Sequence, residues 1–206
     1  MNRTYRIVWN AARNAFIVTH ENAKTKGKPS STRKGVVSAV AAALLAMAAT
    51  PAMAATDCLT PGVIIIDGAA TAGCGLAGGD SLTVTSAGLI IPTAGSVAAV
   101  TVNAVTVGDI NNNGTISQLS SGTGINVTSG GSVGSIVNSG TISGQWAGIW
   151  VGWGSAITGG IDNQAGGSIS GLFSGGIAVT SSSVSGGITN AGTISNSGSS
   201  VVLHSV

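Results

Sequence analysis

Few residues of this 206-residue chain could carry out acid–base chemistry. Every Lys and Arg lies at or before Lys34, and His204 is the only His that follows this residue. The acids after Lys34 stand singly in the sequence, so none forms an obvious carboxylate pair for general acid–base catalysis, although folding could bring distant ones together. They are Asp57, Asp67, Asp80, Asp109 and Asp162. We therefore expect no catalytic residue, no metal site and no cofactor in this segment, and no enzyme activity from it.

The charge is divided sharply along the chain. The formal net charge of +2 is due to the first 34 residues, because the eight Lys and Arg all lie there. The remainder has five acids and no Lys or Arg, which gives it a formal charge of −5. It has no basic patch, so we expect no nucleic acid partner.

Gly79-Asp80-Ser81-Leu82 resembles the sequence pattern of a family of serine esterases, some of which are autotransporter passengers. The resemblance implies that Ser81 is a nucleophile, which needs a His base and an orienting Asp. Members of that family supply both from a later Asp-x-x-His, whereas Val201 stands three residues before His204 here. We therefore expect a turn that enters the first coil of a repeat, not an esterase site.

The two cysteines, Cys58 and Cys74, favour a structural cross-link. Both lie after an export signal described below, and exported proteins meet an oxidising compartment. An even pair close in sequence predicts a disulfide, while a zinc site lacks further ligands nearby. We expect residues 55–78 to form a disulfide-linked N-terminal cap that covers the open end of a repeat stack.

Three tryptophans lie within one short segment of a chain that has only 3% aromatic residues. Ile149 and Val151 are expected to point inward, which turns Trp150 outward. One hypothesis is that Trp146, Trp150 and Trp153 form a stacking platform for a sugar ring or a host protein. The alternative, which the sequence favours, is that Trp146 and Trp153 fill corners while Trp150 packs on a neighbouring strand.

The segment that positions these residues is a repeat. Gly134-Ser135-Ile136-Val137-Asn138-Ser139-Gly140-Thr141-Ile142-Ser143 returns in degraded form along the chain. The equivalent position is Ser86 in a faint first copy, and then Asn112, Asn138, Asn163 and Asn190, at intervals of 26, 26, 25 and 27 residues. A period in this range indicates a stacked repeat architecture.

Each period has three short β signals separated by Gly and Ser clusters. The first surrounds the Asn, the second alternates apolar residues such as Ile125 and Val127, and the third is a lone β-branched residue such as Val133. This pattern predicts an all-β fold, a right-handed parallel β-helix of about 25 residues per coil over residues 79–206, cut off within a coil.

The repeated Asn predicts a structural column inside the helix. Stacked Asn amides hydrogen-bond to one another along a stack of coils, and Asn tolerates turn conformations. The glycine two positions later, at Gly114, Gly140 and Gly192, would then allow a positive φ at the corner. We expect the ladder of Asn112, Asn138, Asn163 and Asn190 to be structural and not a ligand site.

Residues 1–54 predict an export signal. Arg33-Lys34, an apolar run from residue 35 to 49 and then Ala52-Met53-Ala54 have the order of a secretory signal peptide. The apolar run is shorter than the ~20 residues of a membrane-spanning helix. We expect a helical or disordered leader, with an extension over residues 1–28, an ordinary signal peptide over 29–54 and cleavage between Ala54 and Ala55.

The start of the leader, Met1-Asn2-Arg3-Thr4-Tyr5-Arg6-Ile7-Val8-Trp9-Asn10, resembles the extended signal peptide region of type V secreted proteins of Gram-negative bacteria. The Asn-x-Gly-Thr-Ile-Ser repeat also resembles autotransporter passenger domains. The resemblance implies export by the Sec machinery and a partner outer-membrane β-barrel translocator, which we expect to be missing from this chain.

Three functions remain open from the sequence. The first is an exported, non-catalytic passenger at the cell surface, a stalk or adhesin that binds a host-cell protein or glycan. The second is the N-terminal part of a secreted polysaccharide-acting enzyme or esterase. A two-partner secretion exoprotein is a third possibility.

Overall fold

The computed structural model describes residues 5–10, 15–20, 58, 61–93, 98–196 and 200–204. The chain divides into two units, Met1–Thr50 and Pro51–Val206. In the first unit, β1 (Tyr5–Asn10) pairs antiparallel with β2 (Ala15–His20). Both segments are rich in β-branched and aromatic residues, which favour strands. This part of the leader is therefore not helical or disordered as expected, while the apolar run and the Ala54–Ala55 cleavage site lie outside the described residues.

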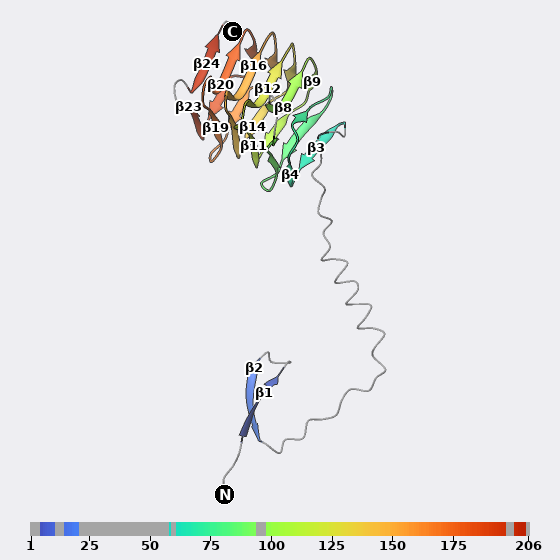
Figure 1. Ribbon diagram of the computed structural model, residues 1–206, viewed down its shortest axis with the longest axis vertical. Coiled ribbons are helices and arrows are strands. Elements are labelled where there is room, and N and C mark those ends of the chain that lie inside the picture. The colour runs from blue at the N-terminus through green and yellow to red at the C-terminus, as the bar shows by residue number, and fades with distance from the viewer. Residues whose placement is uncertain are drawn as a thin grey trace. The chain divides into compact units, whose positions relative to one another are not determined.

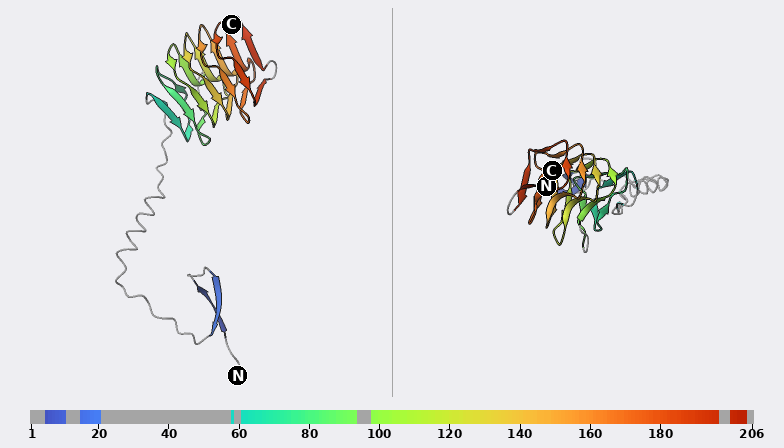
Figure 2. Two further views of the ribbon diagram at one scale, coloured as in Figure 1. Left: turned by 180° about the vertical axis from the view of Figure 1, so that it is seen from behind. Right: turned by 90° about the horizontal axis from the view of Figure 1, so that it is seen from above.

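The second unit is a parallel β-solenoid of about five coils, as the sequence predicts. Successive strands along its axis belong to successive coils (Figures 1 and 2). The described residues form three six-stranded sheets and one four-stranded sheet in this unit, with every pairing between coils parallel.

The strands of each sheet follow in chain order. The first sheet contains β3 (Val63–Ile66), β6 (Ser81–Val84), β10 (Ile110–Asn112), β14 (Ile136–Asn138), β18 (Ile161–Asn163) and β22 (Ile188–Asn190). The second contains β4 (Ala69–Ala70), β7 (Leu89–Ile90), β11 (Thr115–Gln118), β15 (Thr141–Gly144), β19 (Ser168–Gly171) and β23 (Thr193–Asn196).

The third sheet contains β5 (Cys74–Gly75), β8 (Ala98–Asn103), β12 (Thr123–Thr128), β16 (Ala147–Gly152), β20 (Gly175–Thr180) and β24 (Val201–His204). The fourth contains β9 (Thr106–Val107), β13 (Ser132–Val133), β17 (Ala156–Ile157) and β21 (Ser183–Val184).

The coil has four strands where the sequence suggested three. The segment around each Asn was expected to be one strand, but it divides into a first-sheet and a second-sheet strand on either side of a corner. In the central coil, β14 ends at Asn138 and β15 begins at Thr141. Ile136 and Ile142 on the two strands are both fully buried, because the corner turns each of them toward the core.

The core is a set of aliphatic columns that run along the solenoid axis. Ile110, Ile136 and Ile161 pair in the first sheet, and Ile116, Ile142 and Ile169 in the second. All six are buried. Val201 and Leu203 pair in the same way with Ile177 and Val179 but remain exposed, because β24 is the outermost strand of its sheet.

The asparagines form a hydrogen-bonded column at the corner. The Asn112 Nδ2 donates to Asn138 Oδ1 at 2.8 Å, Asn138 to Asn163 at 2.8 Å, and Asn163 to Asn190 at 2.7 Å. Each Nδ2 also donates to a backbone carbonyl of the following coil, as Asn138 does to Ser168 O at 3.3 Å. The side chains of Asn112, Asn138 and Asn163 are fully buried.

The first copy of the repeat has a different register from the one expected. Val84, not Ser86, lies opposite Asn112. The turn that follows Val84 has two more residues than the turn after Asn112, because Thr115 pairs with Leu89. The column therefore begins at Asn112, whose Oδ1 has no hydrogen-bond partner.

The corner glycines are required for a reason other than the one predicted. Gly114, Gly140 and Gly192 do not have a positive φ, so that expectation is wrong. A Cβ at Gly140 would instead overlap the carbonyl oxygen of Gly114 in the preceding coil. Glycine is needed because the backbones of successive coils approach closely at this corner.

A disulfide joins Cys58 to Cys74 across 16 positions, with a Cα–Cα distance of 5.1 Å. The segment expected to be a separate cap contributes β3, β4 and β5, which are the first strands of three sheets. Residues 63–75 therefore form the first coil of the solenoid, in register with the second. The disulfide ties Cys58 to this coil.

Candidate functional site

The outer face of the third sheet carries the aromatic side chains that the sequence singled out. Strands β12 and β16 lie side by side with Ile125 opposite Ile149 and Val127 opposite Val151, all buried. The residues between them, Asn126 and Trp150, are opposite each other on the outer face.

Trp146 and Trp153 do not fill corners. Their side chains are 55% and 64% exposed, whereas Trp150 is partly buried. The Trp146 ring lies 5.9 Å from the Phe173 ring, and the Trp150 ring meets the Trp153 ring edge to face at 4.7 Å. The two exposed rings thus lie at the two ends of β16, with Trp150 between them in sequence.

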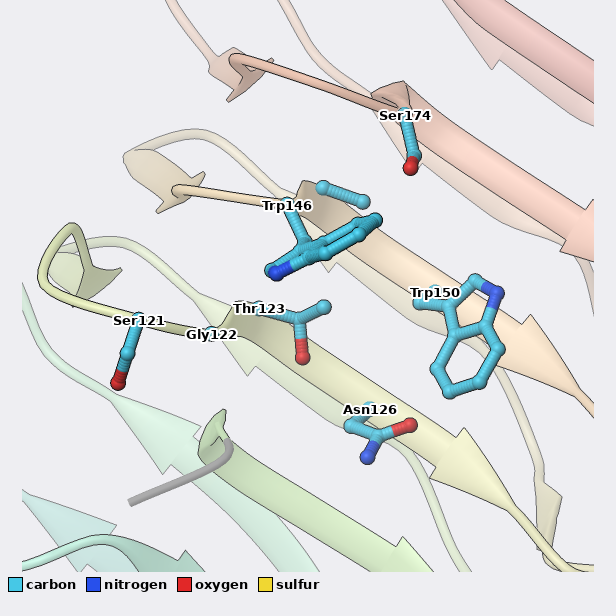
Figure 3. A pocket seen from close by; sticks show the side chains of 8 residues that line it. Ser121, Gly122, Thr123, Asn126, Trp146, Trp150 and Ser174 are labelled. Atoms are coloured by element: carbon cyan, nitrogen blue, oxygen red, sulfur yellow. The ribbon is translucent and has the colours of Figure 1, made fainter. Parts of the chain in front are cut away.

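A hollow of about 330 Å³ lies between the Trp146 and Trp150 side chains and strand β12. Figure 3 shows Trp146 beside Thr123 and Trp150 beside Asn126. The lining residues come from three successive coils and none is charged: Ser121, Gly122, Thr123, Asn126, Trp146, Ala147, Trp150 and Ser174.

Two side-chain oxygens in this hollow have no hydrogen-bond partner. Thr123 is 6% and Asn126 is 5% exposed, and both Thr123 Oγ1 and Asn126 Oδ1 are buried and unpaired. Buried polar atoms nearly always have a partner, so each exception needs a physical explanation. Neither residue was singled out from the sequence. The signal that could have found Asn126 is its alignment with Trp150 in the next coil.

Trp153 occupies a backbone conformation that large side chains rarely adopt. Its φ is +56°, and the corresponding turns of other coils contain Ala104, Ser129 and Ser181 at φ +57°, +56° and +48°. The positive φ is therefore a property of the corner that follows each of these third-sheet strands. The small Ala and Ser side chains of the other coils adopt this conformation with less steric conflict than Trp does. A bulky, largely exposed Trp at this corner has a conformational cost of about 1–2 kcal/mol with little burial in return.

The residues considered for ester hydrolysis are not brought together. Ser81 lies in β6 of the first sheet, and His204 lies in β24, the outermost strand of the third sheet. Asp80 is buried and its carboxylate accepts hydrogen bonds from the Gly62 and Ala77 backbone N–H groups, both at 2.7 Å. Asp80 of the segment 79–82 thus links the first coil to the second through hydrogen bonds.

Within the described residues, no group of three or more His, Cys, Asp or Glu could hold a metal ion. Asp109 and Asp162 each link two neighbouring coils of the solenoid. Asp109 accepts hydrogen bonds from the Ser135 N–H and hydroxyl at 2.8 Å, and Asp162 accepts from the Thr189 hydroxyl at 2.7 Å. The described part of the chain contains no helix that is long and apolar enough to cross a membrane.

The leader is similar to a known class of export signal. Residues 1–50 match the family described as Extended Signal Peptide of Type V secretion system. A comparison with solved structures found no match. The resemblance of the leader is thus confirmed over residues 1–50, and with the parallel β-solenoid it supports an autotransporter passenger. A leader of this class indicates Sec-dependent export in a type V secretion context.

Proposed function

We propose that this chain is the N-terminal passenger of an autotransporter-type protein, that it reaches the cell surface, and that it serves there as a non-catalytic adhesive stalk. The observation that carries the proposal is the combination of a type V leader over residues 1–50 with a parallel β-solenoid after it. A leader of this type specifies the route, and a solenoid provides a rigid, extended surface on which contacts with a partner can be placed.

A non-catalytic role is supported by the contacts of three of the four acids described in the solenoid. Asp80, Asp109 and Asp162 each accept hydrogen bonds from neighbouring turns or strands, which occupies them structurally. An adhesive role is supported by the exposed aromatic rings of the third sheet, because exposed Trp is enriched at binding surfaces and rare elsewhere.

The test is made on bacterial cells that express the parent gene. Antibody or protease is added to intact cells, and the mature N-terminus is sequenced. We expect the segment after residue 55 to be accessible and the mature chain to begin at Ala55. A product that only becomes accessible when the outer membrane is broken would refute the surface role.

A further inference from the structure

Three buried side-chain oxygens in the described residues have no hydrogen-bond partner. One of them, Asn112 Oδ1, is at the end of the Asn column, where Val84 offers no donor. The other two belong to Thr123 and Asn126, which both line the hollow beneath Trp146 and Trp150. Two of the three unpaired oxygens among the described residues therefore belong to one place, and this place is a surface hollow lined by two tryptophans.

We propose that this hollow binds a neutral oligosaccharide, a site that would give the proposed adhesive passenger its ligand and that rests on that function. Sugar rings have apolar faces that stack on indoles and hydroxyl groups that donate hydrogen bonds. Trp146 and Trp150 line this hollow, and the exposed Trp153 lines an adjoining hollow that shares Asn126 with it. Thr123 Oγ1 and Asn126 Oδ1 accept hydrogen bonds from the sugar hydroxyls. Each oxygen thereby gains the partner that it lacks in the free protein.

The charge distribution selects an uncharged ligand. No residue that lines the hollow is charged, and the chain has no Lys or Arg after Lys34 to pair with a carboxylate or sulfate. The formal charge of −5 on the same part of the chain would repel an acidic glycan at low ionic strength. The uncharged lining also offers no ion pairs to the charged side chains of a protein partner, so it suits a protein ligand less well.

The surface extends beyond a single ring. Asn126 also lines a second hollow, together with Trp153 and with Thr101 and Asn103 of β8. The two hollows therefore share Asn126 and continue along the outer face of β12 and its neighbours. Trp146 and Trp153 lie about 20 Å apart if the strand between them is extended, which is longer than one sugar ring. The shape fits an oligosaccharide that lies along the strands.

Access to the two oxygens requires a side-chain movement, because both atoms are buried. Trp146 is more than half exposed, and an exposed side chain changes rotamer within nanoseconds. Trp146 lies beside Thr123 (Figure 3), so rotation of its indole would change the space around Thr123 and present the ring face to a sugar. Binding should therefore change the tryptophan fluorescence as well as release heat.

The test uses the purified 206-residue chain. It is titrated with six-unit oligomers of glucose, N-acetylglucosamine and mannose, and with an oligogalacturonate as the acidic comparison, by calorimetry and tryptophan fluorescence. We expect at least one neutral oligomer to bind and the acidic oligomer to bind more weakly. Trp146→Ala and Trp153→Ala should each lower the affinity about tenfold, which is the loss of one stacking contact.

Thr123→Val separates binding from stability. Valine keeps the shape of threonine and removes the unpaired hydroxyl, so we expect a higher Tm together with a several-fold lower affinity. The matched control is Val63→Ala, which shortens an exposed apolar side chain of the first sheet and should leave the affinity unchanged.

Failure of every neutral oligomer to bind, or unchanged affinity in both Trp variants, would overturn the proposal. Binding to a glycoprotein that persists after its glycans are removed would also overturn it, because the ligand would then be protein. None of these results would affect the exposure of the chain on intact cells, so failure of the glycan site and failure of the surface role can be told apart.

Discussion

At the scale of single residues, the Asn column shows how a buried amide can stabilise a stack of coils. Asn138 donates to Asn163 Oδ1, to Gly140 O at 3.1 Å and to Ser168 O, and accepts from Asn112. A side chain that is completely buried has no water to replace these bonds. The column therefore links the turns of four successive coils through polar groups that are nearly all satisfied.

We expect Asn138→Ala to lower the free energy of unfolding by about 2–4 kcal/mol, because it removes several buried hydrogen bonds and leaves Asn163 Oδ1 without a donor. Asn190→Ala at the exposed end of the column is the control and should cost about 1 kcal/mol or less. Urea denaturation of both variants measures the difference. Equal losses would show that the interior of the column contributes no more than its end.

The positive-φ corner gives a second residue-level prediction. Ala104 is exposed and has φ +57°, which is unfavourable for a residue with a Cβ. Ala104→Gly should raise the free energy of unfolding by about 0.5–1 kcal/mol, since the relief of strain exceeds the entropic cost of glycine. Ala191→Gly, at an exposed turn without a positive φ, should lower it by a similar amount. Thermal denaturation that gives the same sign for both would contradict the argument.

At the scale of elements, the first coil depends on its disulfide. Strands β4 and β5 have two residues each and form few backbone hydrogen bonds. The chain-entropy relation assigns about 3 kcal/mol to a cross-link that closes a loop of this length. Reduction, or Cys58→Ser with Cys74→Ser, should remove that stability and increase amide hydrogen exchange in β3 to β5 first. Unchanged exchange in these strands after reduction would show that stacking on the second coil is sufficient.

Some features of the strands and corners can be predicted from the sequence, and others cannot. The period, the aliphatic columns and the Asn column follow from patterns along the chain, because each coil repeats the same inward positions. The division of the Asn segment into two strands, the register of Val84 and the close approach at Gly140 depend on contacts between coils. Thr123 and Asn126 were missed for the same reason, since neither is unusual until Trp146 and Trp150 of the next coil lie beside them.

At the scale of the whole molecule, each coil contacts only its neighbours, so the stability of the solenoid is expected to be nearly a sum over coils. Ile136 pairs with Ile110 on one side and with Ile161 on the other. Deletion of residues 136–160 would therefore bring Ile161 into the place of Ile136 and keep every inward position in register. Deletion of a fraction of a coil would instead turn inward residues outward.

We expect the chain without residues 136–160 to remain folded and cooperative, with a smaller m-value and a lower free energy of unfolding, because one coil of buried surface is lost. A deletion of residues 136–147 is the control and should abolish the β-rich circular dichroism spectrum. The full-coil deletion also removes Trp146, Trp150 and Trp153, so it should fold without binding the oligosaccharide. A full-coil variant that unfolds completely would show that the coils are not interchangeable units, since one particular coil would then be necessary for the rest to stack.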